Sequence, residues 1–286
     1  MPKIPELMGA PPLNPTKDPL GAYEECGKSK HPSGTSRNVS SEPEAGSGDW
    51  PWQAALYDAH TNEIVCGGSL IHKNWILTAA RCFIGENTLS QNGTTVYLGL
   101  THRLRDMHFR AQEFNVIEVI THPKYIKKLD GGEHNDIALL RLDREARLNP
   151  FVRTVCLPPS HQSRANWYVN PRRMAFVTGW GRTSFNGQNS FALMEIMIPP
   201  VLDSSCRRVM NKKGIAMETT TEFCAGSENG MHDACQGDSG DPLVVQRLEK
   251  YRQIGIVSYG ARCGETYGVY TRVSHYVDWI EGIINE

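Results

Sequence analysis

Short apolar runs separated by turn-forming residues are the main pattern of the chain from Trp50 onward. Many short strands at such close spacing are typical of an antiparallel sandwich or barrel. We therefore predict an all-β fold. The predicted strands cover residues 54–57, 63–70, 75–79, 95–100, 113–120, 137–142, 174–178, 193–199, 243–247, 251–258 and 267–271.

The last residues follow a different pattern. Apolar side chains recur there at helical spacing, which predicts a C-terminal helix with one apolar face. Ser274 is the expected cap of this helix, because a serine oxygen can accept a hydrogen bond from the first turn. The apolar face would consist of Val277, Ile280, Ile283 and Ile284.

The chain divides into two parts of different composition. Residues 1–37 contain seven prolines and little apolar periodicity, so we expect an extended segment that Cys26 ties to the rest. Residues 38–286 would form the folded domain, and 38–49 its linker. The first residues contain no apolar stretch of the kind found in signal peptides, so we expect a fragment of a longer, secreted product.

Composition excludes several classes of protein. The 30 Lys and Arg residues nearly balance 31 Asp and Glu, which argues against a nucleic-acid binder. No run reaches the roughly 18 apolar residues of a membrane span. The eight cysteines are dispersed, without a close Cys-x-x-Cys pair, so four disulfides formed in an oxidising compartment fit better than a zinc site. Spacing alone leaves the pairing open.

Two local features suggest chemistry. In the segment GDSG (237–240), the flanking glycines allow a tight turn that exposes the Ser239 hydroxyl. The backbone amides of Gly237 and Ser239 would then converge as an oxyanion hole, although an ordinary polar turn has the same composition. Asp136 precedes an apolar strand, where a buried carboxylate needs a partner.

With their context, these features resemble the trypsin-like branch of the chymotrypsin-fold serine peptidases over residues 38–286. The resemblance implies two packed six-stranded β-barrels with an active site between them, which contains Ser239 and Asp136. Its motifs are WPWQ (50–53), CGGSLI (66–71), WILTAA (75–80), NDIAL (135–139), VTGWG (177–181), DACQGDSG (233–240) and GVYTRV (268–273).

The resemblance also implies a disulfide pairing. A further bridge that is common in the family is absent as a complete pair, because Ala175 and Val245 occupy its positions. The implied bridges are Cys26–Cys156, Cys66–Cys82, Cys206–Cys224 and Cys235–Cys263, the first of which tethers a propeptide in relatives.

The main departure from the family is Arg81, which stands where active relatives have the catalytic histidine. Arginine stays protonated and offers only donors, so it cannot take the serine proton. We expect Arg81 to form a charged pair with Asp136 instead. A substitute base would have to come from another histidine, of which His72 is nearest in sequence, but the family register places it away from the cleft.

The second departure is Asp241, where the family has glycine. The carboxylate would disturb the backbone if this position requires a positive φ, or add charge beside the site. A tolerated turn residue is the alternative.

The third departure is the activation segment. Relatives are cut before an apolar residue, but here Arg37 precedes Asn38, which lies in a glycosylation sequon. A new amino terminus would otherwise reach Asp238. Asn92 lies in a second sequon, in an expected surface loop.

The resemblance assigns a pocket for a basic side chain to Asp233, Ser258, Gly260 and Gly268. This pocket would still recognise exposed Arg or Lys of a polypeptide, or be an unused inheritance. The basic segment 102–110 is a weaker candidate for binding an acidic protein or glycan, since charged blocks are usually solvated surface. Leu100 stands where a calcium carboxylate would be, so we expect no metal, and we expect no cofactor.

The predicted function is therefore a secreted serine peptidase homologue that is catalytically inactive and acts as a binding or regulatory module. The alternative is a trypsin-like endopeptidase that cleaves after Arg or Lys, based on the intact Ser239, Asp136 and Asp233. A third explanation is that Arg81 reflects an error in the sequence.

Overall fold

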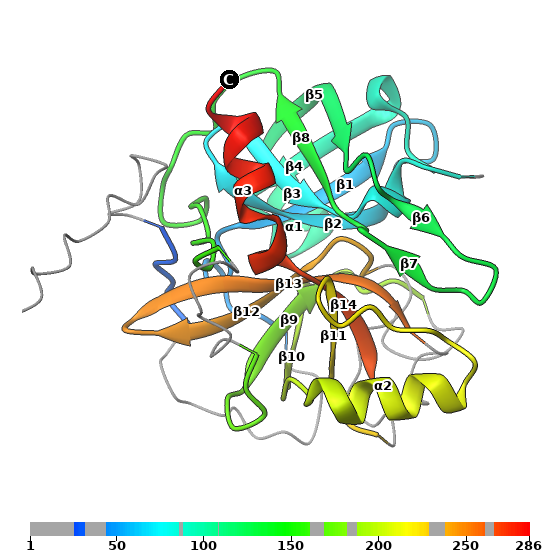
Figure 1. Cartoon of the computed structure of the whole chain (residues 1–286). Helices are drawn as coiled ribbons and strands as arrows, with labels where there is room; N and C mark the ends of the chain where they lie inside the picture. The colour runs from blue at the N-terminus through cyan, green and yellow to red at the C-terminus, as the bar shows by residue number, and fades with distance from the viewer. Residues whose placement is uncertain are drawn as a thin grey trace, which may run out of the picture.

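Two six-stranded β-structures form the core of the protein, and the chain passes from one to the other after residue 142 (Figure 1). The computed structural model describes residues 26–31, 44–85, 88–107, 109–160, 169–181, 188–228, 238–260 and 266–286. This arrangement confirms the predicted all-β class with a C-terminal helix, and of the two implied six-stranded barrels the first is a closed barrel and the second a six-stranded sheet.

The first structure is a closed antiparallel barrel, with strand order β1-β2-β3-β8-β5-β4. It closes because β1 pairs with both β2 and β4. Alternating residues fill the interior, and Leu56, Ile76 and Leu140 have no exposed surface. The strands are β1 (Gln53–Asp58), β2 (Glu63–His72), β3 (Trp75–Thr78), β4 (Thr94–Leu98), β5 (Gln112–Thr121) and β8 (Ala138–Leu142).

The second structure is a sheet of order β10-β9-β12-β13-β14-β11. Pro200 follows β10 and forms a bridge with Ala225 of β11, which brings the two ends of the sheet together. A separate apolar cluster fills its interior, including Phe223, Leu243 and Tyr270. The strands are β9 (Ala175–Gly179), β10 (Met194–Ile198), β11 (Glu222–Ala225), β12 (Pro242–Arg247), β13 (Lys250–Gly260) and β14 (Gly268–Arg272).

The shorter elements were not predicted from the sequence. They are the 3-10 helices η1 (Ala80–Cys82) and η2 (Gln91–Gly93), the helices α1 (Arg103–Met107) and α2 (Asp203–Lys212), and the two-stranded ribbon β6 (Ile126–Lys127) with β7 (Glu133–His134).

The C-terminal helix is α3 (Val273–Ile284), which packs Tyr276 and Ile280 against the protein (Figure 1). Ser274 is not its cap, contrary to the prediction. The N-cap is Arg272, the last residue of β14, and it makes no side-chain capping bond. Because the strand runs directly into the helix, Ser274 is already inside the first turn. None of the helices in the described part of the chain is long and apolar enough to cross a lipid bilayer.

The amino-terminal segment is attached to the second sheet by several contacts. Cys26 forms a disulfide with Cys156, and the Tyr251 amide donates to the Gly27 carbonyl at 2.8 Å. His31 is 5 % exposed and inserts into an aromatic cluster, which we define as Trp50, Trp52, Phe176 and Tyr251. Residues 26–31 are therefore part of the folded structure.

Two more of the implied bridges are formed, Cys66–Cys82 and Cys206–Cys224. The fourth, Cys235–Cys263, lies outside the described residues. Ala175 and Val245 are both buried, so apolar contacts occupy the place of the missing bridge.

Candidate active site

Asp136 is placed at the start of β8 by the residue before it. Asn135 has a positive φ of 53°, a backbone conformation that Asn tolerates better than most residues. Its side chain donates to the Lys124 carbonyl at 2.7 Å and accepts from the Tyr276 hydroxyl at 2.9 Å. The turn directs Asp136 inward, where it has no exposed surface.

The Asp136 carboxylate accepts two hydrogen bonds, both of which stabilise its charged form. The Arg81 backbone amide donates to one oxygen at 2.8 Å, and the Ser258 hydroxyl donates to the other at 2.5 Å. Burial outweighs these bonds and raises the pKa of Asp136 to about 6 from an ordinary value of 3.8. The carboxylate therefore carries its charge at neutral pH at a cost to stability.

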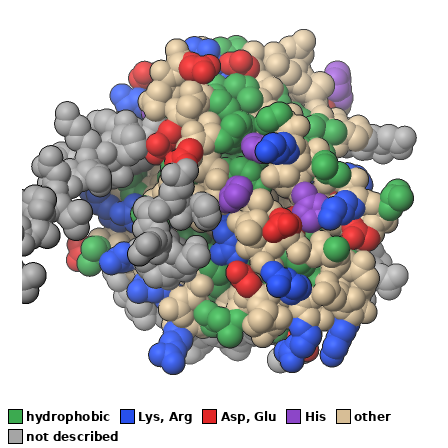
Figure 2. Space-filling view, in the orientation of Figure 1, with side chains coloured by type: hydrophobic (Ala, Val, Ile, Leu, Met, Phe, Trp, Pro, Cys, Tyr) green, Lys and Arg blue, Asp and Glu red, His purple; other side chains and the backbone are tan. Residues whose placement is uncertain are grey.

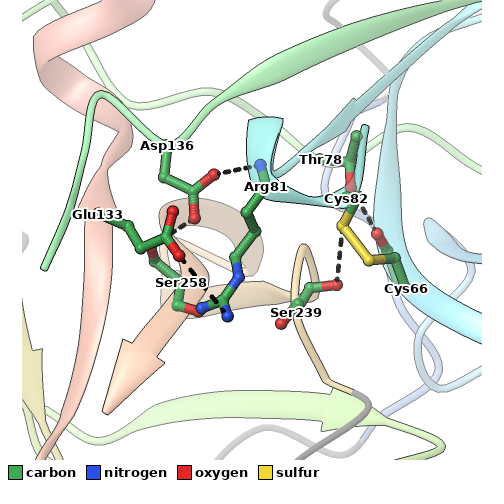
Figure 3. Close-up of a disulfide and its surroundings, with 9 residues drawn as sticks. Cys66, Thr78, Arg81, Cys82, Glu133, Asp136, Ser239 and Ser258 are labelled. Carbon is green, nitrogen blue, oxygen red and sulfur yellow. Dashed lines mark hydrogen bonds and ion pairs between the residues drawn. A yellow bond between two sulfur atoms is a disulfide. The ribbon is translucent and has the colours of Figure 1, made fainter. Parts of the chain in front are cut away.

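The Arg81 guanidinium does not contact Asp136, contrary to the expected charged pair (Figure 3). It donates to the Ser258 carbonyl and lies 3.8 Å from the Glu133 carboxylate. Ser258 explains this direction, because the β13–β14 register shifts between Val257 and Tyr259. Such a bulge leaves a residue outside the ladder, so its carbonyl remains available to the guanidinium.

Ser239 lies beside Arg81, on the turn that precedes β12 (Figure 3). Its carbonyl accepts from the Gly67 amide at 2.9 Å. The next residue, Gly240, has a φ of 89°, and a Cβ there would lie 2.3 Å from the Thr78 hydroxyl. No hydrogen bond joins the Ser239 hydroxyl to another residue of the described part of the chain.

Only some of the other predicted site residues belong to the part of the chain that the structure describes. Asp233 and Gly237 lie outside the described residues, so the predicted oxyanion hole and the base of the pocket stay predictions. Gly260 and Gly268 are cross-strand partners at the adjoining ends of β13 and β14. Ser258 is two residues before Gly260 and bonds to both Arg81 and Asp136.

His72 does not supply a base to this site. It is the last residue of β2, and its ring hydrogen-bonds to the Asn74 side chain at 2.6 Å. It is not among the residues that line the cavity around Arg81.

Asp241 is a buried residue rather than a turn residue. Its φ is not positive, because Gly240 carries the left-handed conformation of this turn. The Asp241 side chain is 1 % exposed and accepts a hydrogen bond from Gln53. A Cβ on Gly67 would lie 1.6 Å from one carboxylate oxygen, and a Cβ on Gly179 would lie 2.3 Å from the other. The expected backbone disturbance therefore does not arise.

Asp238 and Asp241 form a pair of neighbouring carboxyl groups. The Gly181 amide donates to Asp238 at 2.8 Å. Burial, together with the charge of Asp238, holds the pKa of Asp241 well above its usual range. The Asp241 carboxyl therefore favours its protonated form more strongly than an exposed aspartate does. The segment that would be cut, at Arg37 and Asn38, lies outside the described residues.

A cavity of about 210 Å³ borders Ser239 and Arg81. Lys127 and Glu133 from the β6–β7 ribbon, together with Tyr125 just before β6, line its other side, and sequence reasoning missed all three. Glu133 is 3 % exposed, accepts from the Tyr125 hydroxyl, and lies 3.8 Å from the Lys127 ammonium. The only signal in the sequence was the position of Glu133, a charged residue a few positions before the apolar run that forms β8.

The basic segment 102–110 is partly neutralised by its own surroundings. Arg103 is 8 % exposed and pairs with Glu63 at 2.8 Å, and Arg105 pairs with Asp106 at 3.1 Å. On a different part of the surface, the face shown in Figure 2, basic and acidic side chains are intermixed. Asn92 is exposed in η2, as expected for a sequon in a surface loop.

Comparison with known proteins agrees with this geometry. The Trypsin family profile matches residues 39–280. The chain is 38 % identical over 246 residues to vitamin K-dependent protein C of Mus musculus, covering 84 % of this chain and 50 % of that protein. It is 34 % identical to tryptase of Mus musculus (87 % of this chain, 89 % of that protein) and 34 % identical to a venom protease of Bombus pensylvanicus (81 % and 93 %).

The chain thus spans about half the length of protein C but most of the other two relatives. The match covers both β-structures and the residues around Ser239, Asp136 and Arg81. On the fold, the site and these matches, the chain belongs to the trypsin family of serine peptidases.

Proposed function

We propose that this trypsin-family chain does not cleave peptide bonds and acts as a binding or regulatory module for polypeptides with exposed Arg or Lys. The observation that carries the proposal is Arg81, at the position that the family resemblance gives to the catalytic histidine. Its guanidinium bonds to the Ser258 carbonyl and makes no hydrogen bond with the Ser239 hydroxyl.

The chemical argument concerns the proton of Ser239. A serine hydroxyl becomes a nucleophile when a neighbouring base removes its proton, and that base later protonates the leaving amine. Arginine has a pKa above 12 and no acceptor, so it can do neither at neutral pH. Removing the histidine alone from a subtilisin-type peptidase lowers kcat by about 10⁶-fold. We expect a loss of that order here.

Binding of a basic side chain rests on separate residues. Asp233 would supply the countercharge, and the small residues Gly260 and Gly268 leave room beside it. Since none of these groups is needed for proton transfer, recognition is separable from cleavage. Segment 102–110 is a weaker candidate for an acidic partner, because Arg103 and Arg105 already have acidic partners.

We also propose an extracellular location. Three formed disulfides within the described residues are unusual for proteins of a reducing compartment. The exposed sequon at Asn92 is consistent with passage through a secretory route, where it would be glycosylated.

The test is an amidase assay on Arg- and Lys-containing peptides with four proteins: the unmodified chain, Ser239→Ala, Arg81→His and the double variant. We expect no difference between the unmodified chain and Ser239→Ala. Turnover that appears in Arg81→His, and disappears when Ser239→Ala is added, would assign the loss to residue 81. Turnover by the unmodified chain that Ser239→Ala abolishes would overturn the proposal.

The alternative function is a trypsin-like endopeptidase that cleaves after Arg or Lys. It is favoured by the retained Ser239 and by the Ser258–Asp136 hydrogen bond of 2.5 Å, which keeps the carboxylate in place. A serine-directed phosphonate separates the two functions. Rapid labelling at Ser239 supports the peptidase, because a serine without a base reacts slowly.

A further inference from the structure

We propose that the cavity around Arg81 binds a carboxylate next to the basic residue of a bound polypeptide. The ligand class is therefore a segment in which Asp or Glu adjoins Arg or Lys. This inference rests on the proposed function, and it adds an acidic requirement to the basic one.

The charges that line the cavity favour an anion. Arg81 and Lys127 contribute two positive charges and Glu133 one negative charge, which leaves a net charge of +1. Burial and the neighbouring Glu133 hold the pKa of Tyr125 far above its usual value, so Tyr125 adds no charge. One bound carboxylate would make the group neutral.

Hydrogen-bond donors remain available on both cations. The guanidinium has five N–H groups, and one of its nitrogens donates to Ser258. The Arg81 guanidinium and the Lys127 ammonium each lie 3.8 Å from the same Glu133 carboxylate oxygen. Both distances are longer than an ordinary hydrogen bond. No hydrogen bond runs from the Lys127 ammonium to any residue of the described ranges. A carboxylate placed between them would receive donors that Glu133 leaves unused.

A cation is a poorer occupant. Glu133 is the acidic group that lines the cavity, within the part of the chain that the structure describes. One of its oxygens accepts from the Tyr125 hydroxyl, and the other faces both Arg81 and Lys127. A bound cation would therefore be the third positive charge and would meet two like charges.

The size of the cavity suits a single side chain. Its volume of about 210 Å³ is many times the roughly 10–15 Å³ that one water molecule needs, which leaves room for a carboxylate group. The Cys66–Cys82 disulfide and Ile84 provide an apolar wall for the methylene groups of the ligand. Because the cavity borders Ser239, a chain that lies along the site would place a residue adjacent to its Arg or Lys there.

The experiment compares three acetylated and amidated hexapeptides, in which one arginine has asparagine on both sides, aspartate before it, or aspartate after it. Affinity for the unmodified chain is measured by fluorescence anisotropy at 0.05 and 1 M NaCl. We expect one aspartate peptide to bind about fivefold more tightly at low salt, the effect of one partly exposed ion pair. The preference should vanish at 1 M, where screening acts over about 3 Å.

Three variants locate the effect. Lys127→Gln should reduce the preference below twofold without affecting folding, because the Lys127 side chain is 68 % exposed. Lys128→Gln makes the same charge change at a residue outside the cavity lining and should keep the preference. Glu133→Gln removes the competing carboxylate and should increase it.

Equal affinity for all three peptides would overturn the inference and leave the proposed function standing, as would a preference that survives Lys127→Gln. The same samples are analysed for cleavage by chromatography. Cleavage of the peptides would contradict the proposed lack of peptidase activity but not the inference about the cavity. In that case the preference for an aspartate peptide would be measured from the rates at which the peptides are cleaved.

Discussion

Replacing Asp136 with asparagine measures the cost of a charged carboxylate that is buried without an ion pair. The asparagine side chain would have nearly the same shape, accept from the Arg81 amide, and donate to a reoriented Ser258 hydroxyl. It would carry no charge at any pH. The difference between the two proteins therefore isolates the charge.

The size of the effect follows from the pKa. Burial raises the pKa of Asp136 from 3.8 to about 6. Each tenfold change in proton affinity is worth about 1.4 kcal/mol, which gives about 3 kcal/mol. The folded protein holds a proton between about pH 4 and 6 that the unfolded chain releases. Its free energy of unfolding therefore falls as pH rises through this window, and the loss is complete above it.

The assay is thermal unfolding at pH 4 and pH 7.5, followed by circular dichroism. We expect equal stability of the two proteins at pH 4. At pH 7.5 the Asp136→Asn protein should be more stable by about 3 kcal/mol, on the order of 8 °C in Tm. Ser258→Ala removes one donor to the carboxylate and should lower stability at pH 7.5 more than at pH 4. An Asp136→Asn protein that is less stable at both pH values would refute the reasoning.

Three further changes are predicted from the same structure. Asp241→Asn should make stability less dependent on pH above the ordinary pKa of aspartate, in pH-dependent urea unfolding, because burial and the charge of Asp238 raise the pKa of Asp241, so that stability is lost as pH rises and the buried carboxyl gives up its proton. Gly240→Ala should cost more than about 2 kcal/mol in the same assay, since it combines a positive φ with a Cβ 2.3 Å from the Thr78 hydroxyl. His31→Ala should cost about 2 kcal/mol and speed protease cutting near residues 26–31, while an unchanged cutting rate would contradict the docking by His31.

Most of the fold was predictable because its strands have a period that the sequence displays. The eleven predicted strands all correspond to strands of the structure, with ends that differ by no more than two residues. The ribbon β6–β7 was missed because two residues in each strand are too few to show a pattern, and strand β11 was missed because a buried glutamate, Glu222, shortens its apolar run. Helix α2 was detectable, since Cys206, Val209 and Met210 are its buried face at helical spacing.

The candidate site was less predictable than the fold. The residue types at positions 81, 136 and 239 followed from the family motifs, but the direction of the Arg81 side chain did not. That direction depends on the bulge at Ser258 and on Glu133, and both come from elements distant in the sequence. Pairing opposite charges was reasonable, yet the charge nearest to Arg81 proved to be Glu133.

The contacts of Asp241 also bear on the order in which the sequence changed. Its carboxylate occupies the space where Gly67 and Gly179 have no side chain. An alanine at either glycine would overlap the carboxylate, so both positions had to be glycine before aspartate was tolerated at 241. Among relatives, we expect an acidic residue at 241 only where both glycines are present. The three positions are therefore sterically coupled, and this coupling limits which substitutions the chain tolerates, apart from any effect on catalysis.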